Sequence, residues 1–452
     1  MARLGKFFGK KRRGRQVVLL GLDGTPYTLL KNLVARGVMP NTAALVETGT
    51  LLQMDSSIPE ISSVAWTSTM TGRNPGKHGV FGFTDLKPGT YELAFPNFTS
   101  VRTNVLWDVL GAAGKRSVII NQPATYPAQK LNGALIAGFV AIDLKKAVHP
   151  PALVPRIESM GYRIDVDSAK AREDMGAFIE DLFETLRVRE QLILELFDEG
   201  AWDFFEAVVT GTDRLHHFLW DAYENESHEH HGVFLDYYRA VDALIGKIVE
   251  RLDEKTPLLL MSDHGFTGIK KEVFLNHWLR GNGYLDFVTS PPTRLSEIAD
   301  GSRAFCLDPA RLYINMQGRF PKGCVGSSDA PALLDELAAK LAALTDPETG
   351  EAMIRSVYRR DEIFSGPLVE QGPDLVLVPN WGWDLKGSVK RQVFGEKGFF
   401  SGMHTQDDAF LFVRGAEVTA TSKPTVRDVM PTILRLAGCD APPDLDGRRL
   451  IA

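Results

Sequence analysis

Short runs of valine, isoleucine, leucine and phenylalanine recur along the chain, and each ends abruptly at a polar residue or glycine. They are Val17–Leu22, Ser117–Ile120, Phe204–Val209, Pro257–Met261, Asp374–Val378 and Ala409–Val413. Continuous apolar runs of this length are typical of strands buried on both faces, as in a parallel sheet. The runs therefore predict a sheet that is covered on both sides.

Helical patterns lie between the apolar runs, and they supply the expected cover. They span Tyr27–Ala35, Asn104–Ala113 and Ala177–Asp198. In the last of these, Phe178, Leu182 and Leu186 recur at the spacing of one helix face. The alternation of strands and helices predicts an α/β fold with a doubly wound, mostly parallel sheet flanked by helices.

Two segments interrupt this alternation. Residues 140–200 have a mostly helical pattern, whereas residues 285–395 are richer in glycine and proline and contain a strand-like piece, Arg311–Met316. A chain of 452 residues is long enough for one large α/β domain with insertions. We therefore expect a core at residues 16–284 and 396–452, with a helical insertion at about 140–200 and a smaller inserted cap at 285–395.

The first fifteen residues carry seven basic side chains and no acidic one. The apolar run that follows ends at Asp23, and it is shorter than the apolar region of about 7–15 residues in a signal peptide. We expect residues 1–15 to be a disordered, solvated tail. The alternative is a weak contact with an anionic membrane, with Leu4, Phe7 and Phe8 as apolar anchors.

Charge and cysteine usage restrict the partners and the compartment. The formal net charge of −6 does not indicate a nucleic-acid partner. The cysteines, Cys306, Cys324 and Cys439, are sparse and odd in number, which argues against a disulfide framework and fits a reducing compartment. No stretch approaches the ~20 apolar residues of a membrane span. We therefore expect a cytoplasmic location.

Acidic residues and histidines gather at the ends of four apolar runs. Asp23 follows the first run, Asp213 and His217 follow Phe204–Val209, Asp263 and His264 follow Pro257–Met261, and His404 shortly precedes the last run. Ligands of open α/β sheets bind at the carboxyl ends of the strands. Each group alone also fits a simpler role, as a turn, a helix surface pair, a capped turn or a loop histidine. A metal site requires such residues to lie at one place, and their shared location at the strand ends therefore favours a metal site.

The donors are sufficient for two metal ions. Asp213, His217 and His404 fill three positions on one ion, and Asp23, Asp263 and His264 fill three on a second. This set suits Zn²⁺, with Mn²⁺ as the alternative. Each ion keeps an open position, and two ions ~4 Å apart can hold the attacking and leaving oxygens of an in-line displacement.

A nucleophile is expected in the segment from Pro59 to Gly72, which has the pattern of a loop followed by a helix that ends at Gly72. Ser62 falls at the expected helix N-terminus, where free N–H groups favour an anion. A serine bound to a metal ion loses its proton more readily, and Ser62 would then be a ligand as well as the nucleophile. The alternative is that Ser62 only caps the helix. Ser63, Thr67 and Ser68 are competing nucleophiles.

Several short motifs, in this order, resemble the type I phosphodiesterase/nucleotide pyrophosphatase branch of the alkaline-phosphatase superfamily, and more narrowly its predicted phosphohydrolase-or-phosphomutase group. The motifs are Gly21–Gly24, Met39–Asn41, Pro59–Val80, Pro123–Pro127, Asp213–His217, Ser262–Gly265, Gly402–His404, Pro431–Leu434 and Asp446–Gly447. The resemblance implies an alkaline-phosphatase-like core. It also implies that Ser62 is the nucleophile, and it groups the metal ligands in the same two sets.

One position departs from the family pattern. Alignment through His78 and Gly79 puts Phe83 where the nucleotide pyrophosphatases carry an asparagine that helps to bind the phosphate. A phenyl ring donates no hydrogen bond, which argues against a nucleotide substrate. The replacement donors are the backbone N–H of Ser63 or a side chain from the cap. Arg319 could grip a phosphate there, or it could form a salt bridge.

The function expected from these features is hydrolysis of a small-molecule phosphate ester, a diester or a monoester, through a phosphoserine at Ser62. The first alternative is a phosphomutase resembling the cofactor-independent phosphoglycerate mutases, which place a large insert soon after the nucleophile. No such insert follows Ser62. The second is an inactive, metal-stabilised binding domain. The sequence after Ser62 does not fit the motif of the sulfatases.

Overall fold

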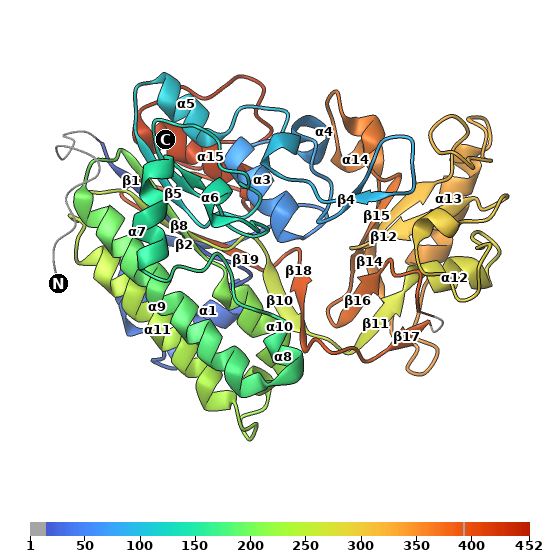
Figure 1. The fold of residues 1–452 in the computed structure, drawn as a ribbon, viewed down its shortest axis with the longest axis horizontal. Coiled ribbons are helices and arrows are strands. Elements are labelled where there is room, and N and C mark those ends of the chain that lie inside the picture. The colour runs from blue at the N-terminus through green and yellow to red at the C-terminus, as the bar shows by residue number, and fades with distance from the viewer. Residues whose placement is uncertain (1–14, 392–393) are drawn as a thin grey trace.

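The structure is a computed structural model that describes residues 15–391 and 394–452. It has a larger lobe, built from the first part of the chain and its C-terminal end, and a smaller lobe built from the yellow and orange segments (Figure 1). The basic tail predicted at residues 1–15, with its possible membrane contact, lies outside the described residues except for Arg15. Among the described residues, no helix combines the length and apolar character needed to cross a membrane.

The larger lobe is built on one sheet, which has eight strands within the described residues. In spatial order they are β2 (Thr50–Met54), β19 (Ala409–Arg414), β9 (Leu258–Met261), β1 (Val17–Leu22), β8 (Phe204–Val209), β5 (Ser117–Ile120), β6 (Gly133–Ile136) and β7 (Val148–His149). The strands from β9 to β6 run parallel, and β19, β2 and β7 are antiparallel to their neighbours. This confirms the predicted fold of a doubly wound, mostly parallel sheet.

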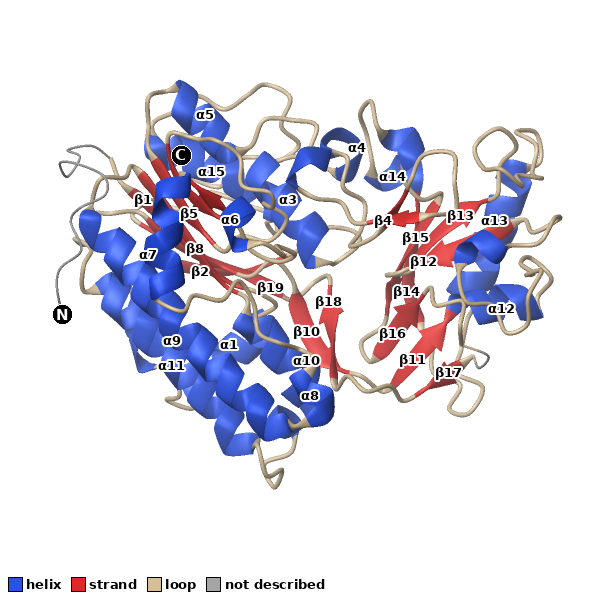
Figure 2. Ribbon diagram, in the orientation of Figure 1, coloured by secondary structure: helices blue, strands red, loops and turns tan. Residues whose placement is uncertain are grey.

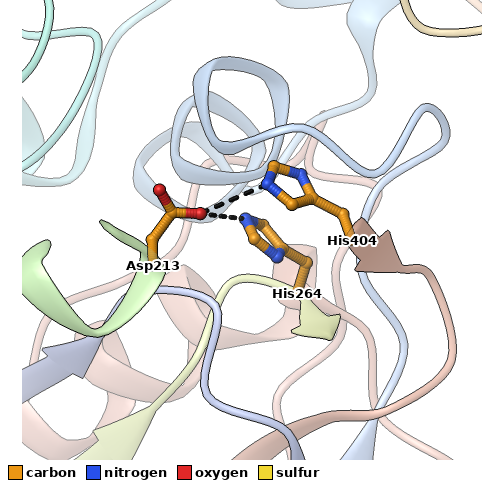
Figure 3. Close-up of side chains that lie close together, drawn as sticks. All are labelled: Asp213, His264 and His404. Carbon is orange, nitrogen blue, oxygen red and sulfur yellow. Dashed lines mark ion pairs between the residues drawn. The ribbon is translucent and has the colours of Figure 1, made fainter. Parts of the chain in front are cut away.

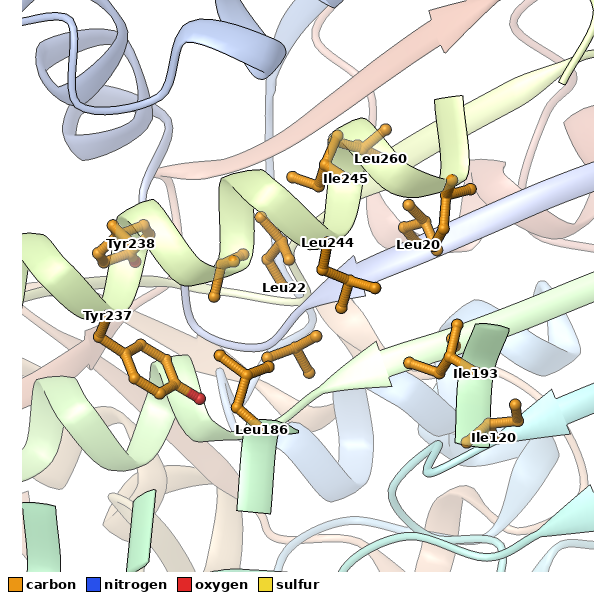
Figure 4. Packing of buried hydrophobic residues seen from close by; sticks show 14 of the residues in the cluster. Leu20, Leu22, Ile120, Leu186, Ile193, Tyr237, Tyr238, Leu244, Ile245 and Leu260 are labelled. Carbon is orange, nitrogen blue, oxygen red and sulfur yellow. The ribbon is translucent and has the colours of Figure 1, made fainter. Parts of the chain in front are cut away.

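Both faces of this sheet are buried, as the continuous apolar runs predicted. In β1, Leu20 and Leu22 pack on one face, and Val17 and Leu19 pack on the other. The first face is covered by α1 (Tyr27–Ala35), α9 (Met175–Glu199) and α11 (His231–Val249). Figure 4 shows Leu20, Leu22 and Leu260 among side chains of α9 and α11. The second face is covered by α3 (Ser62–Thr71), α5 (Leu106–Ala112) and α15 (Val429–Ala437).

The long helix α9 shows how local signals set its ends. Its N-cap is Asp174, whose carboxylate accepts a hydrogen bond from the backbone N–H of Ala177. Gly200 ends it in the left-handed conformation with a φ of 62°. The remaining helices of the larger lobe are α2 (Pro40–Val46), α4 (Pro75–His78), α6 (Leu144–Ala147), α7 (Val154–Ser159), α8 (Lys170–Glu173) and α10 (Gly211–Glu224).

The smaller lobe has its own hydrophobic core. Its antiparallel sheet has the order β12 (Ala304–Leu307), β13 (Arg311–Ile314), β15 (Leu375–Pro379) and β14 (Ile354–Arg359). A second sheet has the order β16 (Trp383–Lys386), β11 (Lys271–Phe274) and β17 (Gly395–Glu396). The helices are α12 (Leu275–Gly281), α13 (Ala330–Ala342) and α14 (Arg360–Ile363), and a short hairpin, β3 (Asp85–Leu86) and β4 (Leu93–Ala94), adjoins the lobe.

The hydrophobic core of the smaller lobe extends beyond the predicted boundaries of the cap. Val273, Leu275 and Leu279 belong to the same hydrophobic cluster as Phe305 and Leu377. We therefore propose that the cap contains β11 and α12 in addition to residues 285–395.

A two-stranded antiparallel ribbon lies between the lobes (Figure 2). It is formed by β10 (Gly265–Gly268) and β18 (Gly402–Thr405), in a register that places Phe266 opposite His404. Gly402 permits a close approach, because a Cβ at this position would lie 2.5 Å from the carbonyl oxygen of His216. The ribbon brings the end of β9 and the segment before β19 to the same place.

Candidate active site

The predicted acidic residues and histidines converge at one end of the main sheet. Asp23 directly follows β1, Asp263 follows β9, and Asp213 lies in the first turn of α10, immediately after β8. These three strands are parallel neighbours, so their carboxyl ends meet at the same edge. All three carboxylates are buried, with at most 4% of each residue exposed.

Asp23, Asp263 and His264 form one group of donors. Nε2 of His264 lies 3.6 Å from Oδ1 of Asp23 and 3.4 Å from Oδ2 of Asp263. The three donor atoms lie within 4.8 Å of one another, as a shared cation requires. Oδ2 of Asp263 is buried and has no hydrogen-bond partner among the described residues. A buried carboxylate oxygen without a partner is costly unless a cation or a proton occupies the position.

Asp213, His217 and His404 form the second group. Oδ1 of Asp213 lies 3.4 Å from Nε2 of His217 and 3.2 Å from Nε2 of His404, and the two Nε2 atoms are 3.1 Å apart. Figure 3 shows His404 and His264 side by side and facing the carboxylate of Asp213, and Nε2 of His264 is 4.0 Å from the same oxygen. The two groups are therefore adjacent, and Asp213, His264 and His404 also satisfy the distances of a metal-binding group.

Backbone carbonyls fix the orientation of all three imidazole rings. Nδ1 of His217 lies 3.2 Å from the carbonyl oxygen of Gly402, Nδ1 of His264 lies 3.0 Å from that of Gly265, and Nδ1 of His404 lies 2.9 Å from that of Glu60. A carbonyl only accepts, so each Nδ1 carries a hydrogen and each Nε2 presents its lone pair to the cluster. This is the arrangement of histidines that ligate metal through Nε2.

The electrostatics of the site favour a cation. Burial raises the pKa of Asp263 to about 7. Burial, and then the charges of Asp263 and Asp213, raise the pKa of Asp23 well above its usual value. Burial lowers the pKa of His217 to about 4, which keeps the ring neutral. Burial also lowers the pKa of His264, whereas at His404 burial is outweighed by the carboxylate of Asp213, which raises the pKa. Closely spaced imidazoles and carboxylates are the donor set of a divalent cation, and the residues present therefore fit two metal ions.

Ser62 lies against the first group of donors. It is the first residue of α3, and the cap position is occupied by Ile61, which makes no side-chain capping bond. Its hydroxyl Oγ lies 3.1 Å from Nε2 of His264 and 3.4 Å from Oδ1 of Asp23. Ser62 is therefore not the capping residue of α3, and its hydroxyl faces the carboxylate and the imidazole.

The positions of the carboxylates are held by neighbouring N–H groups. The indole Nε1 of Trp66 donates to Oδ2 of Asp23 at 3.0 Å, and the backbone N–H of Gly24 donates to Oδ1 of Asp263 at 3.1 Å. Gly24 adopts a φ of 66°, which glycine tolerates without strain. These bonds connect the ends of β1, α3 and β9.

Arg214 is a site residue for which the sequence predicted no role. Its guanidinium donates to Oδ2 of Asp213 at 2.9 Å, and to Oδ2 of Asp165 from Nε at 3.0 Å and from Nη2 at 2.6 Å. It lines the same cavity as Ser62 and lies over the ring of Phe139 at 4.4 Å. The only sequence signal was the position of Arg214 beside Asp213, because its other partner, Asp165, lies in a distant segment of the chain, between α7 and α8.

A cavity of about 120 Å³ adjoins Ser62. Its lining includes Phe83 and Phe139, whose rings stack with centroids 5.6 Å apart. Phe83, at the position where asparagine was expected, thus forms part of an aromatic wall. Ser63 also lines this cavity, and its Oγ is buried without a partner among the described residues.

Arg319, the other predicted phosphate ligand, is not brought into the cluster. Its Nη1 pairs with the carboxylate of Asp374 at 2.9 and 3.1 Å, and its Nη2 donates to the carbonyl oxygen of Gly372 at 2.5 Å. These bonds lie within the cap, and Arg319 lines neither cavity beside the metal-ligand candidates.

Comparison with known proteins agrees with this architecture. The family model of type I phosphodiesterase / nucleotide pyrophosphatase matches residues 17–407. No curated protein sequence matches the chain. Among solved structures, phosphonoacetate hydrolase from Sinorhizobium meliloti 1021 in complex with phosphonoacetate is similar, with a TM-score of 0.62 and 16% identity over 98% of this chain and 100% of that chain. Murine ectonucleotide pyrophosphatase / phosphodiesterase 5 in complex with AMP has a TM-score of 0.56 and 12% identity over 95% of this chain and 96% of that chain. At these identities the structural likeness establishes the fold.

Proposed function

The chain belongs to the type I phosphodiesterase / nucleotide pyrophosphatase family, and on this basis we propose that it is a two-metal hydrolase of small phosphate esters with Ser62 as its nucleophile. The observation that carries the proposal is the position of the Ser62 hydroxyl, 3.1 Å from His264 and 3.4 Å from Asp23, directly beside two adjacent groups of metal donors. A hydroxyl used only to cap a helix has no need of these neighbours.

Six side chains would hold the two ions: Asp23, Asp263 and His264 on the side of Ser62, and Asp213, His217 and His404 on the other side. When bound, the ions lower the pKa of the nucleophile and stabilise charge on the attacking and leaving oxygens. Three protein ligands at each position leave room for Ser62 and for substrate, as in catalytic zinc sites. Zn²⁺ is the preferred ion on this donor set, and Mn²⁺ is the alternative.

The reaction proceeds in two displacements at phosphorus. Ser62 loses its proton to solvent, its Oγ forms a bond to phosphorus, and the bond from phosphorus to the ester oxygen breaks. The electron pair stays on the departing oxygen, which gains a proton, so that an alcohol leaves and a phosphoserine remains. Water then attacks the phosphoserine, which releases phosphate, or a phosphate monoester from a diester, and restores the Ser62 hydroxyl.

Donors near Ser62 are available for the phosphoryl oxygens. The backbone N–H groups of Ser62 and Ser63 lie in the first turn of α3, where no intrahelical acceptor exists, whereas those of Val64 and Ala65 bond to Ile61. Arg214 has five N–H groups, and three of them serve Asp165 and Asp213. We assign the remaining guanidinium N–H groups and the α3 N-terminus the role that the family gives to asparagine.

The test combines metal content with turnover. Purified protein is analysed by elemental mass spectrometry and assayed with para-nitrophenyl phosphate and bis(para-nitrophenyl) phosphate, with and without a chelator. The proposal predicts close to two ions per chain and turnover that the chelator abolishes and Zn²⁺ or Mn²⁺ restores. Failure to bind any divalent metal under loading conditions would contradict it, and the preferred ester separates a monoesterase from a diesterase.

A further inference from the structure

A second cavity, of about 180 Å³, adjoins the metal-ligand candidates and is lined by residues of both lobes. The larger lobe contributes Glu60, His217 and His404, and the cap contributes Asp308, Asp384 and Lys386. The two cavities share Ile61, His217 and His404, so both adjoin the same reaction centre.

The position of this cavity relative to Ser62 indicates which part of the substrate it receives. In an in-line displacement the leaving oxygen lies across phosphorus from the attacking Oγ of Ser62. Ser62 lies against Asp23 and His264, and neither of these residues nor Ser62 lines the second cavity. Of the two donor groups, only the second contributes to its lining, through His217 and His404. An alcohol that departs on the side of the second donor group would therefore enter this cavity.

The charges in the cavity restrict the chemistry of its occupant. Lys386 is paired with Asp384 at 2.7 Å, so its ammonium is already neutralised. Asp308 accepts a bond from the backbone N–H of Gly387 at 2.6 Å, and the Oε2 atom of the buried Glu60 has no hydrogen-bond partner among the described residues. Three carboxyl groups thus face one ammonium group. Among the protein groups that line the cavity, acceptors exceed donors, which favours, beyond the reach of the two proposed ions, an occupant that donates hydrogen bonds over an anionic one.

We propose that this cavity is the leaving-group subsite, and that Glu60 and Asp384 select a small alcohol bearing hydroxyl or ammonium donors over an anionic leaving group. This inference rests on the proposed phosphate-ester hydrolysis. The volume of about 180 Å³ is below the range of cavities that hold drug-sized ligands, so the alcohol is small. Because Asp384 and Lys386 belong to β16, the cap sets the specificity while the core performs the reaction.

A comparison of substrates with different leaving groups tests the proposal. The kcat/KM values for glycerol phosphate and phosphoethanolamine are compared with those for methyl phosphate and inorganic pyrophosphate, or the corresponding methyl diesters are used if diesters are preferred. The wild-type protein is expected to favour the donor-bearing alcohols by about tenfold or more, the size of one well-placed polar contact. Para-nitrophenyl ester turnover serves as the internal measure of a working site.

Two variants test which residues produce the preference for donor-bearing leaving groups. Glu60→Gln and Asp384→Asn are each expected to reduce about tenfold the ratio of kcat/KM for glycerol phosphate to kcat/KM for methyl phosphate. Lys390→Met, which alters an exposed cap residue outside the cavity, is the matched control. Calorimetric binding of glycerol phosphate to Ser62→Ala, alone and combined with Glu60→Gln, gives a readout without turnover and should show weaker binding in the double variant.

The outcomes separate this inference from the proposed function. Turnover of para-nitrophenyl esters without any leaving-group preference, or with a preference that both variants retain, overturns the leaving-group subsite and leaves the hydrolase intact. Absence of turnover for all esters in metal-loaded protein contradicts the proposed function itself. If one variant does not fold, the other still decides, because Glu60 and Asp384 belong to different lobes.

Discussion

The imidazole rings of His264 and His404 stack with their centroids 3.7 Å apart, although they come from segments on either side of the inserted cap. The antiparallel pairing of β10 with β18 produces this contact. Each ring donates Nδ1–H to a backbone carbonyl and turns Nε2 toward a buried carboxylate. The two histidines therefore join the two groups of donors into one centre.

Removing one of these histidines should affect one metal position selectively. His404→Ala is expected to lower the metal content from close to two ions toward one, because Asp213 and His217 alone make a weak site. Elemental analysis of the purified variant measures this. His228→Ala changes a histidine outside the cluster and should leave the metal content unchanged. Two ions in His404→Ala would exclude His404 as a ligand.

The support of Asp23 by Trp66 can be tested without altering any ligand. Trp66→Phe keeps most of the buried ring but removes the indole N–H that donates to Asp23 at 3.0 Å. Loss of such a supporting bond typically weakens metal affinity by about 10- to 100-fold. A metal titration with a competing chelator measures the change. Unchanged affinity would show that this hydrogen bond does not orient Asp23.

Arg214 offers a test of phosphoryl binding. Arg214→Lys keeps the positive charge beside Asp213 but loses the planar fork that serves Asp165 and Asp213 together. We expect kcat/KM to fall by about 10²-fold or more while the metal content stays near that of the wild type. Steady-state kinetics and elemental analysis on the same preparation measure both. Equal kcat/KM would assign Arg214 a structural role only.

Glu206 predicts a pH dependence of stability that is independent of the active site. This glutamate lies in β8 with 1% exposure, and burial raises its pKa from 4.5 to about 8. The folded protein thus holds a proton that the unfolded chain releases above pH 4.5, so folding loses stability as pH rises from 4.5 to 8. Glu206→Gln removes the titrating carboxyl group, so the stability of the variant should not fall with pH for this reason.

The experiment for Glu206 is denaturant unfolding of both proteins across that pH range. The difference in free energy of unfolding between Glu206→Gln and wild type should increase with pH, in favour of the variant. Glu417→Gln, an exposed change, should give a difference that does not depend on pH. A constant difference for Glu206→Gln would mean that Glu206 is ionised when folded, with Gln122 as its nearby amide partner.

The fold was largely predictable because burial on both faces leaves a strong local pattern. The runs Val17–Leu22, Ser117–Ile120 and Phe204–Val209 coincide with β1, β5 and β8. The direction of a strand could not be predicted in this way, because a continuous apolar run has the same pattern in a parallel and in an antiparallel strand. The sequence therefore did not indicate that β19 is antiparallel to β9, or that β10 pairs with β18.

The candidate site was predictable to the extent that its residues follow strands. Asp23, Asp213 and Asp263 were found because their position after a strand is visible in sequence. Asp384 and Lys386 were not, because their role depends on how the cap closes over the core, and no local pattern reports that contact. The sequence places Arg214 beside Asp213 but predicted no role for it, because its partner Asp165 belongs to another segment of the chain.

The central claim, that Ser62 attacks phosphorus, is tested most directly by trapping the intermediate. Metal-loaded protein is mixed with substrate, quenched in acid, digested and analysed by mass spectrometry for a phosphorylated peptide. The account predicts phosphate on Ser62, and it predicts a loss of turnover on the order of 10³-fold or more in Ser62→Ala with metal content and fold retained. Phosphate on Ser63 or Thr67, or turnover retained in Ser62→Ala, would contradict it.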